Sequence, residues 1–566
     1  MMGCRIVAAW MVVLCACLVP AHGAPTSELE SIMARLTDGD SGIRRVAMID
    51  LARTGDPRLE AFFEAYRTRA LYSLAGRIVF CDELIQDADD NDLAPLSDPL
   101  SREPLLKDGQ PLVIPVDDLK EIGRKRKDRR LASQMKHLVR LSSVDPKLRF
   151  SAAKKCAEPV VLAATNQLTK LSQTDPELKI RRIATESMLL IQASGLVPGQ
   201  ALQDKLAAVK ALGERKSLRS ASRLSEELAL LEAATGADAA PESIIVYKTS
   251  LRQIANHQTF VDSCSNVLQG LSLGSVLILM ALGLAITFGL MGVINMAHGE
   301  LLMLGAYATY EMQRLFVWLI ETGRLEQGAY DWYYVAAFPV AFLTAAVAGG
   351  LIELLVVRHL YRRPLESLLA TWGVGLILIQ AVRIRYGDNI GVNAPEWARG
   401  SVEILQDVQV PFARIFIIVL CIVCVLVIYA LMNHTTLGLR IRATMQGRDM
   451  ARSLGVNARR IDLYTFAFGA GLAGIAGYAV TLISGVTPDM GQQVYIVDSF
   501  LVVVTGGLGE LIGVIYAGLG IGVLTKAVEP ITGTIWAKIL LLIAVVIFIR
   551  FRPTGLIAPK GRLSDV

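Results

Sequence analysis

The sequence predicts an all-α protein in which an exported helical domain precedes a polytopic membrane domain of eight or nine helices. Of its 566 residues, 53% are hydrophobic and only 19% are charged, a balance too apolar for an ordinary soluble protein. The mean hydropathy of +0.45 agrees with this. The apolar residues are concentrated after residue 266, in blocks of roughly 20 residues, the length that a membrane helix requires. The region before them is charged and alanine-rich, and the chain therefore divides into a soluble and a membrane part.

The first 23 residues are typical of a signal peptide. Arg5 precedes an apolar run that ends in the small residues Ala21, Gly23 and Ala24. We expect cleavage after Gly23, with a retained anchor as the alternative, and export of the next domain. Residues 24–241 then form a periplasmic helical domain, residues 242–265 a linker helix and residues 266–566 the membrane domain.

A short internal repeat lies in the soluble region. The pattern of residues 138–149 recurs at residues 168–179, 30 residues later, and each copy contains Asp-Pro, at Asp145 and at Asp175. We expect each Asp to cap the following helix and each Pro to open it. The units resemble HEAT-like repeats, with two similar helical hairpins in an irregular domain as an equal alternative.

The remaining soluble stretches show less regularity. Residues 85–115, rich in Asp, Pro and Leu, predict a loop, and the basic run at residues 120–130 predicts a solvated helical face.

Nine apolar segments are expected after residue 266. The connections between the first and second segments and between the seventh and eighth are very short, which leaves re-entrant segments as an alternative there. Lys and Arg cluster after the third segment, after the fifth and at the C-terminus, which assigns these regions to the cytoplasm. An odd number of spans carries an exported N-terminal domain to a cytoplasmic C-terminus. The segments lie near residues 268–290, 295–315, 332–357, 366–386, 411–432, 461–484, 493–507, 511–528 and 536–551.

Polar residues interrupt the first pair of segments. Asn295, His298 and Glu300 stand where lipid-compatible side chains are expected, and an ionisable group at this depth is read as functional because its burial is costly. Gly289, Gly292 and Gly299 loosen the helix around them, as in the broken helices that expose polar groups to a substrate. The stretch therefore predicts part of a permeation pathway.

The largest cytoplasmic loop, residues 436–457, carries a second feature. Met450 and Leu454, four residues apart, form a small apolar ridge on a basic helix that Gly455 ends. Such a helix fits the groove of a partner, although a positive-inside loop that is simply helical is the alternative.

Three motifs carry a family resemblance over about residues 266–560. The stretch Ile294–Glu300, the loop with Gly455 and the glycines Gly506, Gly507 and Gly509 resemble the permeases of branched-chain amino acid ABC importers. Within that family, residues 285–300, 368–373 and 495–500 are most similar to urea-transporter permease subunits of the UrtB type.

The resemblance implies a set of partners. These are a second permease subunit of the same family, two cytoplasmic ATP-binding subunits, a periplasmic urea-binding protein and the lipid bilayer. It also implies that residues 438–457 form the helix that couples to the ATP-binding subunits, with Arg442, Met445, Met450, Ala451, Leu454 and Gly455 as its candidate residues.

The motifs that are missing narrow the function further. The sequence has no G-x-x-x-x-G-K-[ST], so ATP would be bound by partner subunits. It also lacks H-E-x-x-H and G-x-S-x-G, and no basic-aromatic pattern of a nucleic-acid-binding protein accompanies its net charge of +5. We expect a transport subunit without enzyme activity, cofactor or metal.

A path for urea needs acceptors for its N–H groups and an aromatic face. The residues that fit are Asn295, His298, Glu300, Thr371, Trp372, Asp498 and Ser499. For Asn295 and His298 a helix-to-helix hydrogen bond is the alternative, and for Trp372 ordinary packing. Gly506, Gly507 and Gly509 are expected to form a bend or a helix contact.

Three functions are considered, in order of preference. The first is a permease for urea or a related small amide. The second is a permease for branched-chain or other amino acids, which would require a cation or a helix N-terminus for the substrate carboxylate. The third is a membrane-anchored helical-repeat scaffold or sensor.

Overall fold

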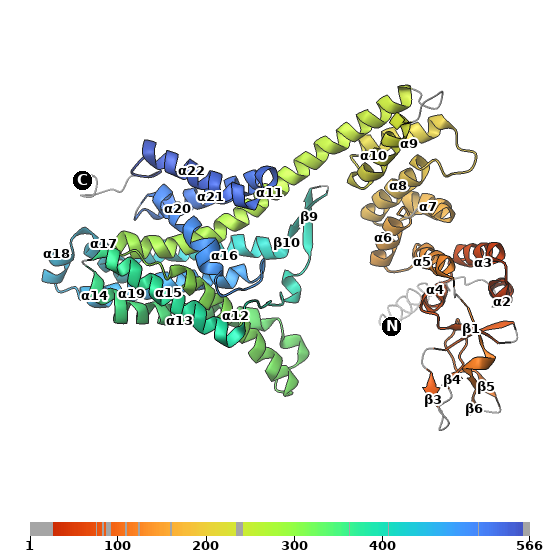
Figure 1. Cartoon of the computed structure of the whole chain (residues 1–566), viewed down its shortest axis with the longest axis horizontal. Helices are drawn as coiled ribbons and strands as arrows, with labels where there is room; N and C mark the ends of the chain where they lie inside the picture. The colour runs from red at the N-terminus through yellow and green to blue at the C-terminus, as the bar shows by residue number, and fades with distance from the viewer. Residues whose placement is uncertain are drawn as a thin grey trace, which may run out of the picture. The chain divides into compact units, whose positions relative to one another are not determined.

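The computed structural model describes residues 26–557 except for residues 75, 82–83, 87–91, 108–109, 123–124, 159–160, 234–240, 362, 406 and 508. The predicted signal peptide lies outside the described residues. The chain separates into two compact units, Met1–Gln258 and Thr259–Val566 (Figure 1).

The N-terminal unit begins with three helices, α2 (Thr26–Ala34), α3 (Ser41–Arg53) and α4 (Leu59–Thr68). Asp40 caps α3, because its carboxylate accepts a hydrogen bond from the Gly42 amide at 3.0 Å. In α4, Phe62, Phe63 and Tyr66 are fully buried against the following helices.

Short antiparallel strands follow α4, so the prediction of an all-helical region with a loop at residues 85–115 is wrong here. Two three-stranded sheets have the orders β2-β1-β8 and β3-β4-β7, and β5 pairs with β6. Strands of two to four residues are too short for an alternating pattern to appear in the sequence. Their bounds are β1 Leu71–Leu74, β2 Arg77–Phe80, β3 Ile85–Gln86, β4 Asp92–Pro95, β5 Leu106–Lys107, β6 Gln110–Pro111, β7 Val113–Pro115 and β8 Lys120–Glu121.

The unit continues as consecutive helices that bury two apolar cores. Their bounds are α5 Arg126–Arg140, α6 Pro146–Lys155, the short 3-10 helix η3 Leu162–Ala164, α7 Thr165–Thr174, α8 Leu178–Ala193, α9 Leu202–Glu214 and α10 Ala221–Ala233.

The two Asp-Pro pairs behave differently. Asp145 caps α6, which Pro146 opens as predicted, with a bond of 2.8 Å from the Lys147 amide. The prediction for Asp175 is wrong, because α8 begins only at Leu178. The Asp175 carboxylate instead accepts from the Glu177 amide at 2.9 Å and pairs with Arg149 of α6 at 2.8 Å, which joins the two copies of the repeat.

Each of the nine predicted apolar segments corresponds to a described helix in or leading into the membrane unit. The long helix α11 (Pro241–Met291) leads in, and π-helical turns, short helices and one hairpin join the others. Their bounds are α12 His298–Glu321, α13 Trp332–Ile352, η6 Glu353–Val357, α14 Arg358–Leu360, α15 Pro364–Tyr386, β9 Ser401–Leu405, β10 Val408–Pro411, α16 Phe412–His434, α17 Thr436–Gln446, α18 Arg448–Ser453, α19 Ala458–Val480, η8 Gly491–Tyr495, α20 Ile496–Gly506, α21 Leu511–Thr532 and α22 Thr534–Phe551.

Among the described helices, seven are long and apolar enough to cross a membrane. The two others are α12, which carries Glu300, Glu311 and Arg314, and α20, which has 11 residues. At 1.5 Å per residue, α20 is about 16 Å long, roughly half of the ~30 Å hydrocarbon core of a bilayer.

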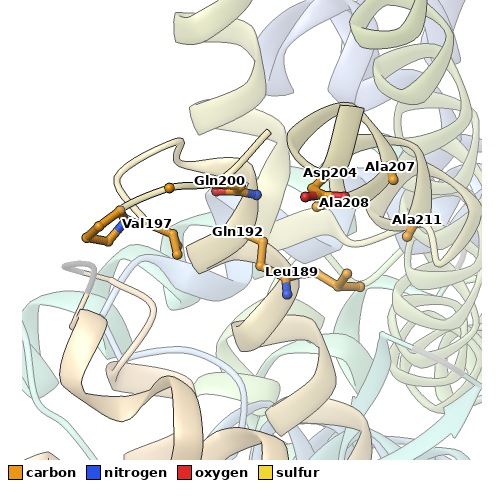
Figure 2. A pocket seen from close by; sticks show the side chains of 10 residues that line it. Leu189, Gln192, Val197, Gln200, Asp204, Ala207, Ala208 and Ala211 are labelled. Carbon is orange, nitrogen blue, oxygen red and sulfur yellow. The ribbon is translucent and has the colours of Figure 1, made fainter. Parts of the chain in front are cut away.

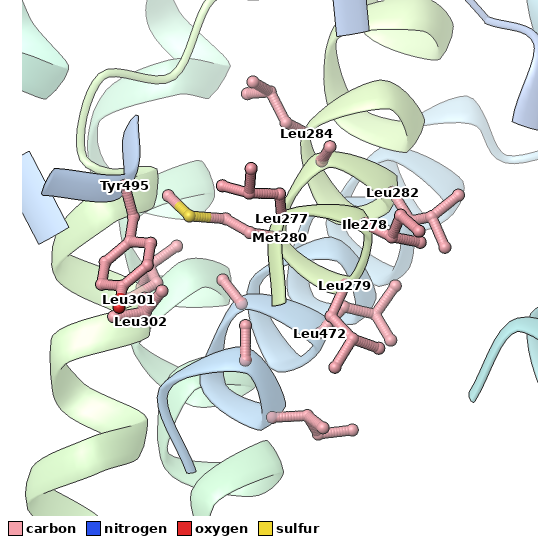
Figure 3. Close-up of a cluster of buried hydrophobic side chains, with 14 of the residues drawn as sticks. Leu277, Ile278, Leu279, Met280, Leu282, Leu284, Leu301, Leu302, Leu472 and Tyr495 are labelled. Carbon is pink, nitrogen blue, oxygen red and sulfur yellow. The ribbon is translucent and has the colours of Figure 1, made fainter. Parts of the chain in front are cut away.

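The core of the membrane unit forms around α19. Three of its glycines touch the backbones of three neighbouring helices. A Cβ at Gly469 would lie 2.8 Å from the carbonyl oxygen of Gly283 on α11, and a Cβ at Gly474 would lie 2.4 Å from that of Ala341 on α13. At Gly477 a Cβ would lie 1.9 Å from the carbonyl oxygen of Leu302 on α12. Figure 3 shows the apolar side chains of α11 in this core, together with Leu472 of α19 and Leu301 and Leu302 of α12. Small residues allow membrane helices to approach this closely.

Candidate functional site

The break between α11 and α12 is the centre of the candidate site. Helix α11 ends at Met291, Gly292 adopts φ +64°, and α12 begins at His298. The Asn295 side chain accepts from the Ala297 amide at 3.0 Å, and the Thr371 hydroxyl accepts from the Met296 amide at 3.1 Å. Side chains thus replace the helical hydrogen bonds that the break removes, as irregular backbone away from water requires.

His298 joins α12 to α11. Its ring is fully buried, and Nε2 lies 3.1 Å from the Met280 carbonyl oxygen. The ring also packs against Gly283, where a Cβ would lie 3.1 Å from Cε1 and Nε2. This geometry corresponds to the helix-to-helix bond considered for His298 in the sequence.

Glu300 faces α15. A Cβ at Gly375 would lie 3.0 Å from the Glu300 carboxyl carbon, and Glu300 Oε2 has no hydrogen-bond partner among the described residues. Ser367, Thr371 and Gly375 follow one another at intervals of four on the same face of α15. We call the group Asn295, Glu300, Ser367, Thr371 and Gly375 the polar seam.

The polar seam carries unused hydrogen-bonding capacity. Within the described part of the chain, Asn295 Nδ2, Glu300 Oε2 and Ser367 Oγ are buried without a partner. Buried polar atoms are normally paired, so each of these calls for an explanation, and a polar solute or water would satisfy them.

The segment η8–α20 packs against the start of α12. A Cβ at Gly491 would lie 2.0 Å from the Gly299 carbonyl oxygen, so the two backbones touch. Eight residues further on, Ser499 is fully buried, and its hydroxyl has no partner among the described residues. Tyr495 of η8 belongs to the same buried apolar cluster as Leu301 and Leu302 of α12 (Figure 3).

Two predicted pathway residues lie elsewhere. Trp372 is 44% exposed, whereas the adjacent Thr371 is fully buried in the polar seam. Asp498 points to Lys538 of α22, at 4.0 Å between Oδ2 and Nζ.

Sequence reasoning missed several buried polar groups. Glu353, in the π-helical turn η6, is fully buried and bonds Arg358 at 3.1 Å and Tyr361 at 3.2 Å. The buried Ser367 was also missed, as was Lys538, the partly exposed partner of Asp498. A charge inside an apolar segment was the available signal for Glu353 and Lys538, since the same reasoning singled out Glu300.

The glycines after α20 make its turn into α21. A Cβ at Gly513 would lie 2.0 Å from the Gly506 carbonyl oxygen, and Gly507 and Gly509 adopt φ of +107° and +84°. These backbone conformations strongly favour glycine.

The predicted coupling region has a different local structure from the one expected. The expectation of one helix is wrong, because Gly447 adopts an extended conformation and separates α17 from α18. Met450 and Leu454 are 73% and 84% exposed, while Ala451 between them is buried. Gly455, with φ +85°, follows the end of α18.

Two further candidate coupling residues, Arg442 and Met445, lie on the preceding helix rather than on α18. Arg442 lies on α17 and reaches the Asn433 side chain at 3.4 Å. Met445 also lies on α17, and its side chain falls outside the described part of the structure.

A pocket of about 570 Å³ lies in the N-terminal unit, between α8 and α9 (Figure 2). Gln192, Gln200 and Asp204 are its polar lining residues, and the others are mainly small or apolar. None of the predicted pathway residues lines it.

The apolar helices, the broken segment at the centre of the bundle and the exposed ridge together define a helical membrane permease. The chain matches the family described as branched-chain amino acid transport system, permease component, over residues 266–549. It belongs to this family.

Curated relatives cover the same region. The chain is 27% identical to the high-affinity branched-chain amino acid transport system permease protein LivH of Escherichia coli K12 over 310 residues. This alignment covers 53% of the chain and 97% of that protein. It is 26% identical to BraD of Pseudomonas aeruginosa, over 51% of this chain and 94% of that protein. It is 24% identical to a probable LivH of Methanocaldococcus jannaschii, over 51% of this chain and 88% of that protein. No solved structure matches.

Proposed function

We propose that this chain is the permease subunit of an ABC importer for urea or a closely related small amide. The observation that carries the proposal is the polar seam, which offers a carboxylate, an amide and hydroxyl groups to a neutral solute. Among the described residues, no Lys or Arg is fully buried in the membrane unit. A neutral amide with N–H donors and one carbonyl acceptor matches this set, whereas a substrate carboxylate would need a counter-charge.

Import of branched-chain or other amino acids is the second candidate, favoured by the names of the relatives. A substrate carboxylate could use the N-terminus of α12 as its counter-charge. However, the Glu300 side chain already stands in the first turn of that helix, at the place that a substrate carboxylate would take. The polar seam therefore favours the neutral amide.

The partners follow from the proposed importer. A second permease of the same family would complete the channel, a periplasmic urea-binding protein would deliver the substrate, and two cytoplasmic ATP-binding subunits would dock on residues 438–457. The exposed apolar side chains of Met450 and Leu454 support this docking. The assembly would sit in the inner membrane with the N-terminal unit in the periplasm and the C-terminus in the cytoplasm.

Uptake of labelled urea and labelled leucine, measured in parallel in cells with and without this chain, tests the substrate. We expect deletion to abolish high-affinity urea uptake, with leucine uptake unchanged, and the intact chain to restore it. Loss of leucine uptake with urea uptake intact would replace the proposal by the second candidate.

A further inference from the structure

A second pocket of the N-terminal unit combines an apolar floor with a basic rim. Its volume is about 440 Å³, and it lies between α3, α5 and residues 161–163. Ile49, Leu131 and Leu162 contribute apolar lining, and Arg45, Lys127 and Arg130 contribute positive charge. We call this pocket the basic groove.

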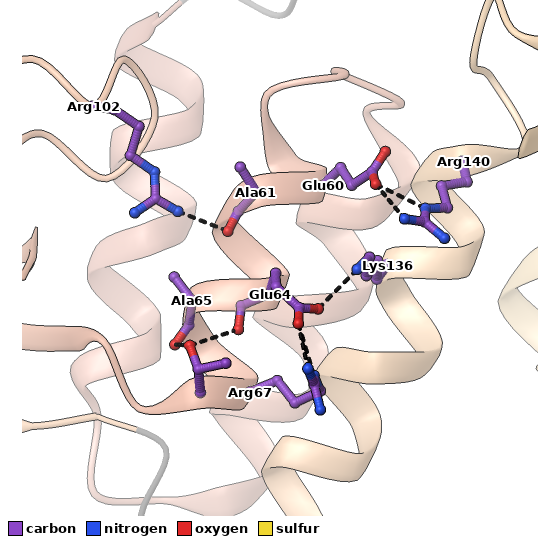
Figure 4. Close-up of polar contacts among 9 residues, drawn as sticks. Glu60, Ala61, Glu64, Ala65, Arg67, Arg102, Lys136 and Arg140 are labelled. Atoms are coloured by element: carbon purple, nitrogen blue, oxygen red, sulfur yellow. Dashed lines mark hydrogen bonds and ion pairs between the residues drawn. The ribbon is translucent and has the colours of Figure 1, made fainter. Parts of the chain in front are cut away.

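Four of the basic residues of α5 form two groups with different surroundings. Lys136 and Arg140 reach Glu64 at 2.8 Å and Glu60 at 2.5 Å on α4 (Figure 4). Lys127 and Arg130 lie on a different face of α5 at 100° per residue. Helix α4 thus neutralises one group of cations and leaves the other at the basic groove.

In the described part of the N-terminal unit, the cations of the basic groove lack a partner of their own. Arg45, Lys127 and Arg130 are exposed, and none forms an ion pair or hydrogen bond with another described residue. The nearest carboxylate on α5, Asp128, is taken by Arg44 at 2.8 Å, and Asp50 of α3 is taken by Arg35 at 3.3 Å.

The N-terminus of α5 also favours a negatively charged ligand. Among the described residues no side chain caps the helix at Lys125, and its first turn holds Arg126 and Lys127 beside Asp128, whose carboxylate is already paired with Arg44. Cations in the first turn of a helix oppose its dipole, whereas a negative group there is favourable. The N-terminus of α5 and the basic groove therefore favour the same ligand charge.

We propose that the basic groove docks an acidic segment of a partner protein, with one apolar side chain of that segment on the floor and its carboxylates on Arg45, Lys127 and Arg130. A small inorganic anion would use the charges but leave Ile49, Leu131 and Leu162 in contact with water, whereas an acidic segment with an apolar anchor uses both. Docking of this kind does not depend on which substrate the permease moves.

Photo-crosslinking tests this docking in the full chain, in its native membrane. A photoreactive phenylalanine analogue replaces Leu162, which is 40% exposed in the basic groove, and the crosslinked residues are identified by mass spectrometry. The same analogue at Leu230 of α10, which is 71% exposed and outside the basic groove, serves as the background control. We expect a crosslink to a segment of another protein that carries net negative charge.

Charge reversal supplies the specificity control. Arg45→Glu with Arg130→Glu should reduce this crosslink by about tenfold or more. Lys147→Glu with Lys170→Glu, at exposed positions of α6 and α7 outside the basic groove, changes the net charge equally and should reduce it much less. If the double variant does not fold, raising the ionic strength from ~0.05 M to ~0.5 M on the unchanged chain should weaken the crosslink instead, because exposed ion pairs are screened.

The proposal is overturned by a crosslink no stronger than that at Leu230, by a crosslink to lipid or within this chain, or by one to a neutral or basic segment. A protein crosslink that neither charge reversal nor salt weakens also overturns it.

Discussion

Gly375 of α15 leaves room for the carboxylate of Glu300, since a Cβ at residue 375 would lie 3.0 Å from the Glu300 carboxyl carbon and 3.2 Å from both oxygens. The contact involves the mobile end of a side chain rather than backbone. A substituent at 375 would therefore push the carboxylate away without separating the helices.

From this contact we predict that Gly375→Ala lowers labelled urea uptake by about tenfold, since strain of this kind is worth roughly 1–3 kcal/mol. The amount of assembled importer should stay unchanged. Gly373→Ala is the matched control, because a Cβ there meets nothing within 4 Å. Equal urea uptake by the two variants would contradict a role for Glu300 in the substrate pathway.

The exposed ridge on α18 gives a second prediction. Met450→Asp with Leu454→Asp should abolish co-purification of the ATP-binding subunits, because the apolar contact would be replaced by two carboxylates. The bundle should remain folded, since both side chains are exposed. Leu196→Asp with Leu230→Asp, at exposed positions of the N-terminal unit, should leave co-purification intact. Retention of the ATP-binding subunits by the first variant would rule out the coupling role.

The glycines of α19 give a third. At Gly477 a Cβ would lie 1.9 Å from the Leu302 carbonyl oxygen, and backbone cannot yield as a side chain can. We expect Gly477→Ala to lower the free energy of unfolding by about 1–3 kcal/mol or more. Thermal unfolding of the purified chain in detergent measures this. Gly520→Ala, where a Cβ meets nothing within 4 Å, should change little, and equal unfolding temperatures would contradict the packing described.

A fourth prediction concerns acid stability of the N-terminal unit. The bonds from Arg67 and Lys136 to Glu64 lower the pKa of Glu64 from 4.5 to about 2. The unfolded chain therefore binds the proton first as the pH falls, so the stabilisation is complete above about pH 4.5 and is lost as the pH approaches 2.

Protease digestion of the full chain in detergent, followed at residues 26–233, measures this stability. Glu64→Gln should make the unit less stable at neutral pH and flatten its pH dependence between 4.5 and 2. Glu226→Gln, at an exposed carboxylate of α10, is the control. An unchanged pH profile in Glu64→Gln would show that the pairs to Arg67 and Lys136 contribute nothing.

The sequence predicted the membrane unit well because long apolar segments depend on one strong effect, the exclusion of polar groups from lipid. The break before α12 was predicted for the same reason, from Asn295 and Gly292. The strands at residues 71–121 were missed, since pairing between short distant segments leaves no local pattern. The break between α17 and α18 at Gly447 could not be predicted either. Glycine alone does not end a helix, since Gly469 and Gly474 remain inside α19, and what separates these positions from Gly447 is their packing.

The site was predicted in part. Membrane depth identified Glu300, but which side of α15 would face it depends on helix rotation, and rotation places Ser367 and Gly375 there while Trp372 is exposed. Residue type alone could not separate Asp498, whose neighbour is Lys538 on another helix, from Glu300, whose neighbour is a glycine.

The backbone contacts of α19 also constrain how this chain can diverge. Gly474 and Gly477 touch α13 and α12, so any larger side chain at either position requires compensating changes on a different helix at the same time. A single substitution at either position, without the compensating change, would leave a poorly folded protein. Variation that alters the transported solute is therefore expected on α15, whose contacts with residues 296–300 involve the side chains of Thr371 and Glu300 and can change one at a time.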